Sequence, residues 1–376
     1  MPNNITVLYI IDSLRRGGAE RQFVELLKNI DRGLVNPVVV YLKHEEKSYI
    51  DELKNKGINP ILVERSWKGD ITPAFRIYKL IVQHKPVLIH SVLNMSGIFG
   101  TLTAKLSGVP HVCSVIRQAR DPNKKTRIIR QLLAYMVDAY VANTKIGLNN
   151  RFSHWRSNFH VIYNGLDISR FSNNKINRSV SGKNKIFKIG MIATVSAHKD
   201  HLTLLKAMCL LRDTLQKNSV EIQYELLIIG DGENRDNLES FVTSNGLESS
   251  VIFTGQIGDV ERIYADLDIA VLLTNASLHA EGISNSLVEA MACGIPVIAT
   301  NDGGTVEFVE SEKNGILIEN GDITGCARAI ERLLSDDALR HQLGQNGHRT
   351  VMEKFSMDSY IGNYLSLYKK ILQGRL

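Results

Sequence analysis

The sequence has little cysteine and no long hydrophobic run. Its 376 residues include only four cysteines, which lie far apart and form no C-x-x-C pair (Cys113, Cys209, Cys293 and Cys326). A disulfide framework or a zinc ribbon needs more or closer cysteines, so we expect neither, and the thiols fit a reducing cytoplasm. No run approaches the roughly 18 apolar residues of a membrane span, and Ile5–Ile11 is too short for a signal peptide. We therefore expect a cytoplasmic protein, either soluble or peripheral on the inner face of the cell membrane.

Charge of neither sign dominates the chain. Lysine and arginine number 45 and aspartate and glutamate 39, so the formal net charge is +6. This excess permits an anionic partner, such as nucleic acid, an acidic lipid surface or a phosphorylated small molecule, and selects none of them. Aromatic residues are not interleaved with the basic ones and no nucleic-acid motif is visible. We therefore expect no nucleic-acid partner.

Short apolar runs alternate with amphipathic helical patterns along the chain. Ile5–Ile11 is typical of a buried strand, and Ala19–Ile30 follows with helical spacing. Such alternation predicts parallel sheets covered by helices on both faces. A polar stretch rich in Ser, Asn and Lys interrupts the pattern, which then restarts. We expect Rossmann-like domains over 1–167 and 186–355, a linker over 168–185, a terminal helix over 356–376, and an active site in the cleft between the domains.

A predicted helix that begins near Ser284 carries the most informative pattern. Ser284, Asn285 or Ser286 can cap this helix, which ends at Gly294. The N-terminus of a helix presents amide N–H groups and a positive dipole end, which suit a phosphate or diphosphate. Glu281 lies just before the helix and Glu289 two turns further on than Glu281, so the two carboxylates are expected to contact different parts of one ligand. The alternative is a capped helix whose glutamates are merely solvated.

The stretch from Glu281 to Glu289 resembles the Glu-x7-Glu signature of retaining glycosyltransferases of family 4, whose fold is called GT-B. Further marks of that family occur in order, and together they cover nearly the whole chain: Gly17-Gly-Ala-Glu20, Val161-Ile-Tyr-Asn-Gly-Leu-Asp167 and Ile229-Gly-Asp-Gly-Glu233. The resemblance implies an N-terminal domain that binds the acceptor and a C-terminal domain that binds a nucleotide sugar. It also implies that the final helix, after about Phe355, crosses back onto the N-terminal domain.

The implied reaction transfers a sugar from a nucleotide diphosphate to an acceptor hydroxyl, with retention at the anomeric carbon and without a metal or other cofactor. A UDP-sugar is the preferred donor and a GDP-sugar the next choice. The typical product of such an enzyme is a surface polysaccharide or a lipid-linked oligosaccharide. Two alternatives remain open, namely a sugar-nucleotide epimerase or hydrolase of the same fold, and a non-catalytic subunit that binds a sugar nucleotide.

The resemblance also assigns roles to individual residues. Glu281 would lie beside the donor sugar and Lys199 would face the diphosphate as a second catalytic group, while Glu289 would hold the ribose hydroxyls and the base would lie near Thr254–Ile257. Arg117 and Glu20 would lie on the acceptor side, although Arg117 could equally form a structural salt bridge. The expected donor-binding residues are Gly17, Gly18, Thr194, Gly255, Gln256, Ile257, Ser284, Asn285, Ser286, Leu287 and Glu289.

One position departs from the family pattern. The family usually has an arginine five residues before the lysine, and this chain has Thr194 there. A charge-assisted hydrogen bond contributes about 1.5–3 kcal/mol, so its loss would lower leaving-group stabilisation by roughly ten- to a hundredfold. Either another cation reaches the diphosphate, with Arg15, Arg16 and Arg117 as candidates, or catalysis is weaker.

A basic segment follows the strand that ends at Arg117. Its cations alternate with apolar residues, as in a peripheral enzyme that rests on anionic lipid, and the equally open alternative is a solvated helix face. The basic residues expected at such a surface are Arg120, Lys124, Lys125, Arg127 and Arg130.

Three patterns that could suggest other chemistry receive a structural interpretation. Asp266-Leu-Asp268 has the D-x-D form of a metal site but introduces a strand, so we expect it to form a turn or cap. His198 and His201 have no carboxylate or cysteine at ligand spacing, so no metal site is expected. Gly230-Asp-Gly232 lacks the third glycine of a dinucleotide fingerprint, which argues against an NAD enzyme.

Overall fold

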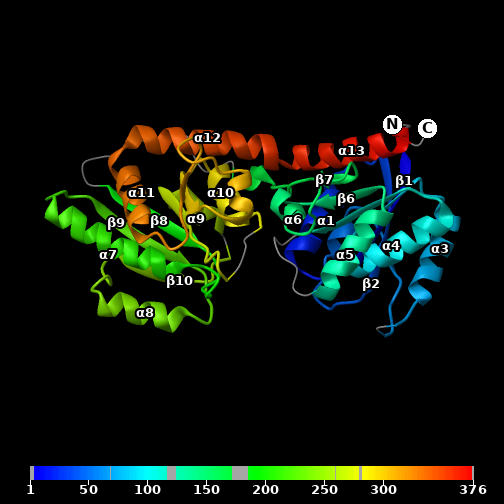
Figure 1. Ribbon diagram of the computed structural model, residues 1–376, viewed down its shortest axis with the longest axis horizontal. Helices are drawn as coiled ribbons and strands as arrows, with labels where there is room; N and C mark the ends of the chain where they lie inside the picture. The colour runs from blue at the N-terminus through cyan, green and yellow to red at the C-terminus, as the bar shows by residue number, and fades with distance from the viewer. Residues whose placement is uncertain are drawn as a thin grey trace. The chain divides into compact units, whose positions relative to one another are not determined.

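The computed structural model describes residues 4–67, 69–116, 124–171, 185–258, 260–278 and 282–374. The chain divides into two compact units, of which unit 1 comprises Met1–Gly165 with Met357–Leu376 and unit 2 comprises Leu166–Ser356. Each unit is built around one parallel sheet (Figure 1). The predicted fold class of two Rossmann-like α/β domains is thereby confirmed. Of the expected linker, residues 172–184 lie outside the described residues.

The sheet of unit 1 has seven strands in the order β3-β2-β1-β4-β5-β6-β7. All neighbouring strands are parallel, so their carboxyl ends share one edge of the sheet. Val, Ile and Leu dominate the central strands, because both faces of this sheet are covered by helices. The strands are β1 Ile5–Ser13, β2 Val35–Lys43, β3 Ile61–Leu62, β4 Leu88–Val92, β5 His111–Ile116, β6 Ala139–Ala142 and β7 Phe159–Val161.

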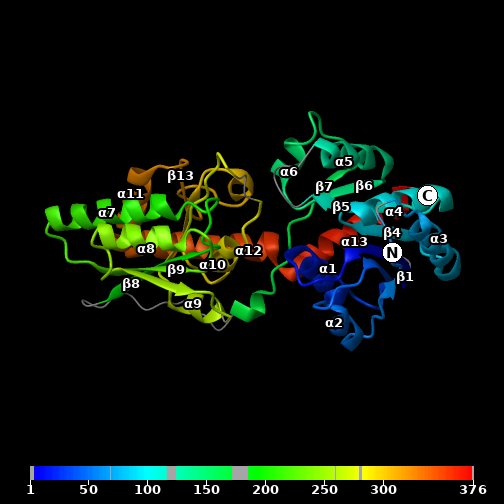
Figure 2. The same ribbon diagram turned by 90° about the horizontal axis from the view of Figure 1, so that it is seen from below.

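Helices cover both faces of this sheet, as Figure 2 shows. On one face, side chains of α1, α2 and α13 share a hydrophobic cluster with β1 and β2. On the other face, α3 and α4 share a cluster with β1 and β2, and α5 shares a cluster with β5 and β6. The helices of unit 1 are α1 Gly18–Asn29, α2 Ile50–Asn55, α3 Thr72–His84, α4 Asn94–Ser107, α5 Lys124–Met136, α6 Lys145–Asn149 and α13 Met357–Gly374.

The terminal helix α13 joins unit 1 through apolar and polar contacts. Tyr368 is fully buried, and its hydroxyl lies 2.7 Å from Nδ1 of His90 and 3.3 Å from the hydroxyl of Tyr9. Nε2 of His90 lies 2.8 Å from Oγ of Ser114, whose hydroxyl also lies 3.2 Å from that of Tyr364. These bonds satisfy polar groups that would otherwise be costly to bury between the helix and the sheet.

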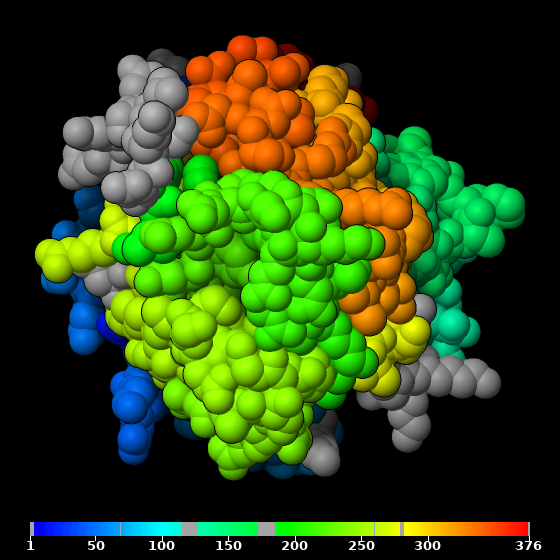
Figure 3. Space-filling model, turned by 90° about the vertical axis from the view of Figure 1, so that its left-hand side faces the viewer, coloured from blue at the N-terminus to red at the C-terminus, as the bar shows by residue number. Residues whose placement is uncertain are grey.

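The sheet of unit 2 has six parallel strands in the order β10-β9-β8-β11-β12-β13. They are β8 Ile186–Ile192, β9 Gln223–Ile229, β10 Val251–Gly255, β11 Ile269–Leu272, β12 Val297–Thr300 and β13 Ile316–Ile318. The helices are α7 His201–Lys217, α8 Arg235–Ser244, α9 Val260–Asp266, α10 Asn285–Ala292, α11 Ile323–Ser335 and α12 Asp337–Phe355. Figure 3 shows α7 and α8, green to yellow-green, with the orange α11 beside α7.

Helix α12 and the short strand β13 are elements of unit 2 that sequence periodicity did not predict. In α12 the reason is visible. It spans 19 residues, but glycines occupy key positions on its buried side. A Cβ on Gly344 would lie 2.1 Å from the carbonyl oxygen of Gly294, and one on Gly347 would lie 3.3 Å from that of Asn314. The helix therefore approaches backbone directly at these glycines, which interrupt the buried apolar row of Leu343, Val351 and Phe355 that would mark an amphipathic helix.

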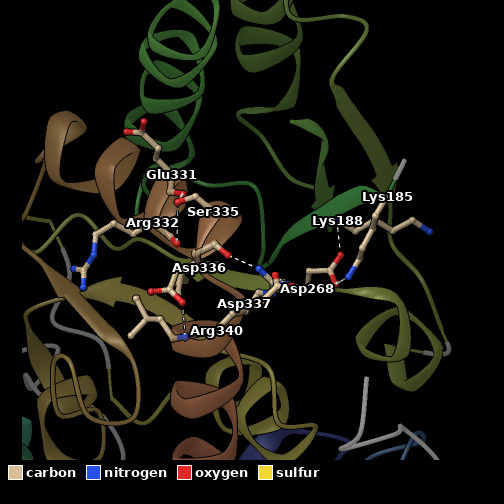
Figure 4. A network of polar contacts seen from close by, with 11 residues as sticks. Lys185, Lys188, Asp268, Glu331, Arg332, Ser335, Asp336, Asp337 and Arg340 are labelled. Carbon is tan, nitrogen blue, oxygen red and sulfur yellow. Dashed lines mark hydrogen bonds and ion pairs between the residues drawn. The ribbon is translucent and has the colours of Figure 1, made fainter. Parts of the chain in front are cut away.

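Asp268 has a structural role, in agreement with the interpretation of Asp266-Leu-Asp268 as a strand entry. Its buried carboxylate accepts hydrogen bonds from Nζ of Lys185 at 2.5 Å and from the backbone N–H of Lys188 at 2.9 Å. Figure 4 shows the side chain of Lys185 at Asp268, which Lys188 contacts through its backbone, and Arg340, which forms an ion pair with Asp337. The carboxylate thus fixes the start of β8 against the segment that leads into β11.

Candidate functional site

The site predicted in unit 2 lies at the carboxyl edge of its parallel sheet. Because every strand is parallel, the loops that follow β8, β9, β10 and β11 all leave the sheet at this edge. Open α/β sheets bind ligands at such an edge. The loops contain, in order, Thr194 and Lys199, the glycines at 230 and 232, Gln256 and Ile257 directly after Gly255, and the segment that enters α10.

Two glycines allow the loop after β9 to pack closely against the loop after β8. Gly230 has φ +138°, and a Cβ there would lie 2.0 Å from the carbonyl oxygen of Ala193. A Cβ on Gly232 would lie 2.3 Å from the carbonyl oxygen of Val195, and the N–H of Val195 donates to the carbonyl of Asp231 at 3.1 Å. Only glycine permits this close approach of two backbones. The contact fixes the backbone on both sides of Thr194, whose side chain is exposed.

Lys199 is held on a loop that is tied to the end of β11. Its backbone pairs with that of Thr274, and the N–H of Asp200 donates to the carbonyl of Leu273 at 3.0 Å. The carboxylate of Asp200 caps α7 by accepting from the N–H of Thr203 at 3.2 Å. The carbonyl of Lys199 lies 2.9 Å from Nδ1 of His201, a buried imidazole whose pKa is lowered by burial. These contacts position a half-buried lysine at the carboxyl edge.

The N-terminus of α10 points to the same edge, because the helix follows β11. Ser284 is the N-cap residue, but its side chain makes no hydrogen bond to an amide of the first turn. Its Oγ lies instead 3.0 Å from Oγ of Ser286. The first amides of a helix have no intrahelical acceptor, so those of Asn285, Ser286 and Leu287 are suited to bind an anion. Leu287 is buried and Asn285 is exposed.

Glu289 lies one turn inside α10 and contacts a tyrosine that sequence reasoning missed. The hydroxyl of Tyr264, on α9, lies 3.1 Å from Oε2 of Glu289 and 3.1 Å from the carbonyl of Ser286. Burial, together with the Glu289 carboxylate, holds the pKa of Tyr264 well above its ordinary value. Tyr264 therefore remains a hydrogen-bond donor and orients the carboxylate. A tyrosine 25 residues before Glu289 carries no motif that could have revealed this contact.

The residues after β10 lie beside a cation that was also missed. Gln256 and Ile257 are exposed, and the carbonyl of Gly255 accepts from the N–H of Gly230 at 3.0 Å. A Cβ on Gly255 would lie 3.5 Å from Nη1 of Arg235, which forms an ion pair with Glu239. Arg235 directly follows the loop after β9 in the sequence. This position could have indicated that its side chain lies near the carboxyl edge of the sheet.

The glycine pair at 303–304 supports the loop that enters α10. A Cβ on Gly304 would lie 2.7 Å from the backbone of Gly282, so the two segments are in direct contact. Glu281 itself lies outside the described residues.

The site residues predicted in unit 1 differ in burial and in their partners. Gly17 is the N-cap residue of α1, and Gly18 has open space where a Cβ would lie. Glu20 is only 3% exposed and pairs with Arg15 at 3.1 Å. Arg16 pairs with Glu52 at 3.7 Å, so both described candidates for the missing arginine already have acidic partners. Arg117 lies outside the described residues.

The predicted basic surface is described only in part. Arg127 is exposed, whereas Arg130 is buried and its Nε donates to Oδ1 of Asn94 at 2.9 Å, so its charge does not face solvent. Arg120 and the side chains of Lys124 and Lys125 lie outside what the structure describes.

Two further properties concern metals and membranes. In the described ranges, no three His, Cys, Asp or Glu side chains gather as metal ligands. Within the same part of the chain, no helix has both the length and the hydropathy that crossing a bilayer requires.

Two family models match successive parts of the chain. The model of glycosyltransferase family 4 matches residues 16–170, and that of glycosyl transferases group 1 matches residues 172–350. The first match lies within unit 1, except for its last few residues, and the second lies within unit 2.

Individual proteins are similar to different extents. A lipopolysaccharide core biosynthesis glycosyltransferase of Rhizobium meliloti is 37% identical over 142 residues, which are 38% of this chain and 41% of that protein. A capsular polysaccharide biosynthesis glycosyltransferase of Staphylococcus aureus is 24% identical over 88% of each chain. The structure of Anabaena HepE in complex with UDP matches with a TM-score of 0.77 at 20% identity, over 97% of this chain and 100% of that one.

Proposed function

The chain belongs to the GT-B glycosyltransferases that family 4 and group 1 describe, and from this membership we propose that it transfers a sugar from a UDP-sugar to an acceptor hydroxyl with retention of configuration. A GDP-sugar is the second choice of donor. The acceptor would belong to the synthesis of a surface polysaccharide or a lipid-linked oligosaccharide, since the two relatives named above act in lipopolysaccharide core and capsular polysaccharide biosynthesis.

One observation carries this proposal, namely that unit 2 places a helix N-terminus and Lys199 at the same carboxyl edge of its sheet. As the glycosidic bond breaks, negative charge accumulates on the leaving diphosphate. Amides of Ser286 and Leu287 and the ammonium of Lys199 would stabilise that charge. The amides and the backbone that carries Lys199 are held in place by the fold, so they require little reorganisation when charge develops. We propose that they suffice without a metal ion.

UDP is preferred because a structure of similar fold holds UDP. In this chain, Glu289 would accept hydrogen bonds from the ribose hydroxyls, with Tyr264 holding its carboxylate in place at 3.1 Å. Glu281 would lie beside the donor sugar, and the base would lie near Thr254–Ile257.

Changing Glu289 to glutamine tests the donor site. Because a hydrogen bond to a charged acceptor contributes about 1.5–3 kcal/mol, we expect the Kd for UDP to rise at least about tenfold. The measurement is thermal shift and calorimetric titration with UDP and UDP-sugars, since a ligand of the native state raises its apparent stability. Glu248→Gln is the matched control, as Glu248 is an exposed glutamate of the same unit.

The same preparations decide the reaction type. UDP release that requires an acceptor glycan indicates transfer, whereas release from the UDP-sugar alone indicates a hydrolase. Unchanged UDP binding in Glu289→Gln would remove Glu289 from the site, and activity abolished by EDTA would contradict the metal-independent mechanism.

A further inference from the structure

The helical layers on the two faces of the unit 1 sheet differ in charge. Helices α3, α4 and α5 span 13, 14 and 13 residues and contain no aspartate or glutamate. Their seven basic residues are Arg76, Lys79, Lys105, Lys124, Lys125, Arg127 and Arg130. On the opposite face, α1, α2 and α13 carry five acidic and five basic residues. Figure 2 shows α3, α4 and α5 on one side of the sheet, with α1 and α2 on the other.

The acid-free layer also exposes large apolar side chains. Ile71 is 76% exposed at the start of α3, and Phe75, one turn further, is 64% exposed. Large hydrophobic residues are exposed on α4 and α5 as well. The set on this layer is Ile71, Phe75, Val82, Leu102, Leu106, Ile128, Ile129, Leu132, Tyr135 and Met136, with Trp67 on the loop before α3. The layer is continuous, because α4 contacts both α3 and α5.

Cations lie directly against exposed aromatic rings on this layer. Nζ of Lys79 lies 4.8 Å from the ring centroid of Phe75, and the guanidinium of Arg156 lies 4.1 Å from that of Tyr135. Such pairs combine an apolar body with a positive head, which is the arrangement of residues at the boundary between lipid tails and headgroups.

Of three described acidic residues beside this layer, two have carboxylates that are bound to backbone amides. The carboxylate of Asp70 is buried and accepts from the N–H groups of Ser66 and Thr72. That of Asp138 accepts from the N–H of His111 at 2.8 Å. Glu64, on the loop before α3, is exposed.

We propose that the outer surface of α3, α4 and α5, with the loop at Trp67, docks on an anionic lipid bilayer. The cations Arg76, Lys79, Lys105 and Arg127 are all exposed and would lie over acidic headgroups, while Ile71 and Phe75 would enter the boundary of the acyl chains. A polyanion alone would leave the apolar side chains in water. The surface is independent of the donor site, which lies in unit 2.

The experiment measures sedimentation of the full chain with vesicles of phosphatidylcholine alone or with about 30% phosphatidylglycerol. We expect at least about tenfold tighter binding to the anionic vesicles, weakened by raised salt. The variant Arg76→Glu/Lys79→Glu should bind about thirtyfold or more weakly, since each basic residue near such a surface contributes about fivefold. The matched control Lys369→Glu/Lys370→Glu makes the same charge change on exposed residues of α13 and should stay within about twofold of the unaltered protein.

A second variant tests the apolar contribution. Ile71→Ser/Phe75→Ser should weaken vesicle binding at least about tenfold, whereas Val220→Ser/Ile252→Ser, on exposed residues of unit 2, should not. Thermal stabilisation by UDP is measured in parallel, so that a misfolded variant or a wrong donor assignment is recognised separately. Equal binding to both kinds of vesicle, or equal loss in variants and controls, would overturn the proposal. So would a dimer that Ile71→Ser/Phe75→Ser dissociates, because the surface would then bind a second copy of the chain.

Discussion

Replacing Lys199 by methionine is expected to lower kcat by about 100- to 1000-fold with little change in the KM for the donor. The ammonium would stabilise charge that develops on the diphosphate only as the glycosidic bond breaks, so its loss weakens the transition state more than the ground state. Methionine keeps an unbranched side chain that is one heavy atom shorter and has no charge. The backbone contacts of Lys199 with Thr274 and His201 do not need the ammonium and should persist.

Lys206→Met provides the control for this variant. Lys206 is an exposed lysine of α7 in the same unit, and its replacement should leave kcat within about twofold. If Lys199→Met retained the full kcat, another cation would have to serve the leaving group, and Arg235 would be the first to examine because it lies beside Gly255 at the same edge. A large rise in the donor KM with unchanged kcat would instead assign Lys199 to ground-state binding.

Unit 1 is expected to lose about 4 kcal/mol of stability between pH 7 and pH 5. Burial lowers the pKa of His90 and that of His111 from 6.5 to about 3. The unfolded chain therefore binds protons at these residues below about pH 6.5, and the folded chain does not until about pH 3. Stability is full above pH 6.5 and falls as the pH decreases, by about 2 kcal/mol for each histidine at pH 5. Urea unfolding at several pH values measures the effect.

Variants separate these histidines from other titrating groups. His90→Gln and His111→Gln should be less stable at pH 7, because each imidazole bonds hydroxyl groups on both nitrogens, and each should show a shallower loss with acid. His154→Gln changes an exposed histidine of unit 1 and should leave the pH dependence unaltered. Identical unfolding midpoints at pH 7 and pH 5 would contradict a buried neutral state for His90 and His111.

The fold followed from sequence wherever burial produced a periodic pattern. The alternation of apolar strands with amphipathic helices predicted both sheets except for the short edge strands β7 and β13, and the cap and stop residues placed α10 within two residues of its observed bounds. Helix α12 escaped this reasoning because Gly344 and Gly347, which pack against backbone, interrupt the row of buried apolar residues on the helix. Because glycine has no side chain, a position where glycine packs against backbone does not contribute to the hydrophobic pattern of a sequence.

Sequence motifs predicted some residues of the candidate site. Residues that reach the site only through tertiary contacts could not be predicted. The resemblance placed Lys199 and Glu289 in a donor site, and these assignments remain predictions. Tyr264 reaches Glu289 across 25 residues, and His90 reaches Tyr368 across 278. Nothing local marks such pairs, because they form only when the sheet brings distant segments together. The burial of Arg130 is of the same kind, since a basic run in the sequence does not show which cation turns inward.

The most direct test of the donor site is the crystal structure of the protein in complex with UDP. The account predicts diphosphate oxygens about 3 Å from the amides of Ser286 and Leu287 and from Nζ of Lys199, with the ribose hydroxyls on Glu289. UDP bound elsewhere, or a diphosphate that contacts neither the N-terminus of α10 nor Lys199, would contradict it.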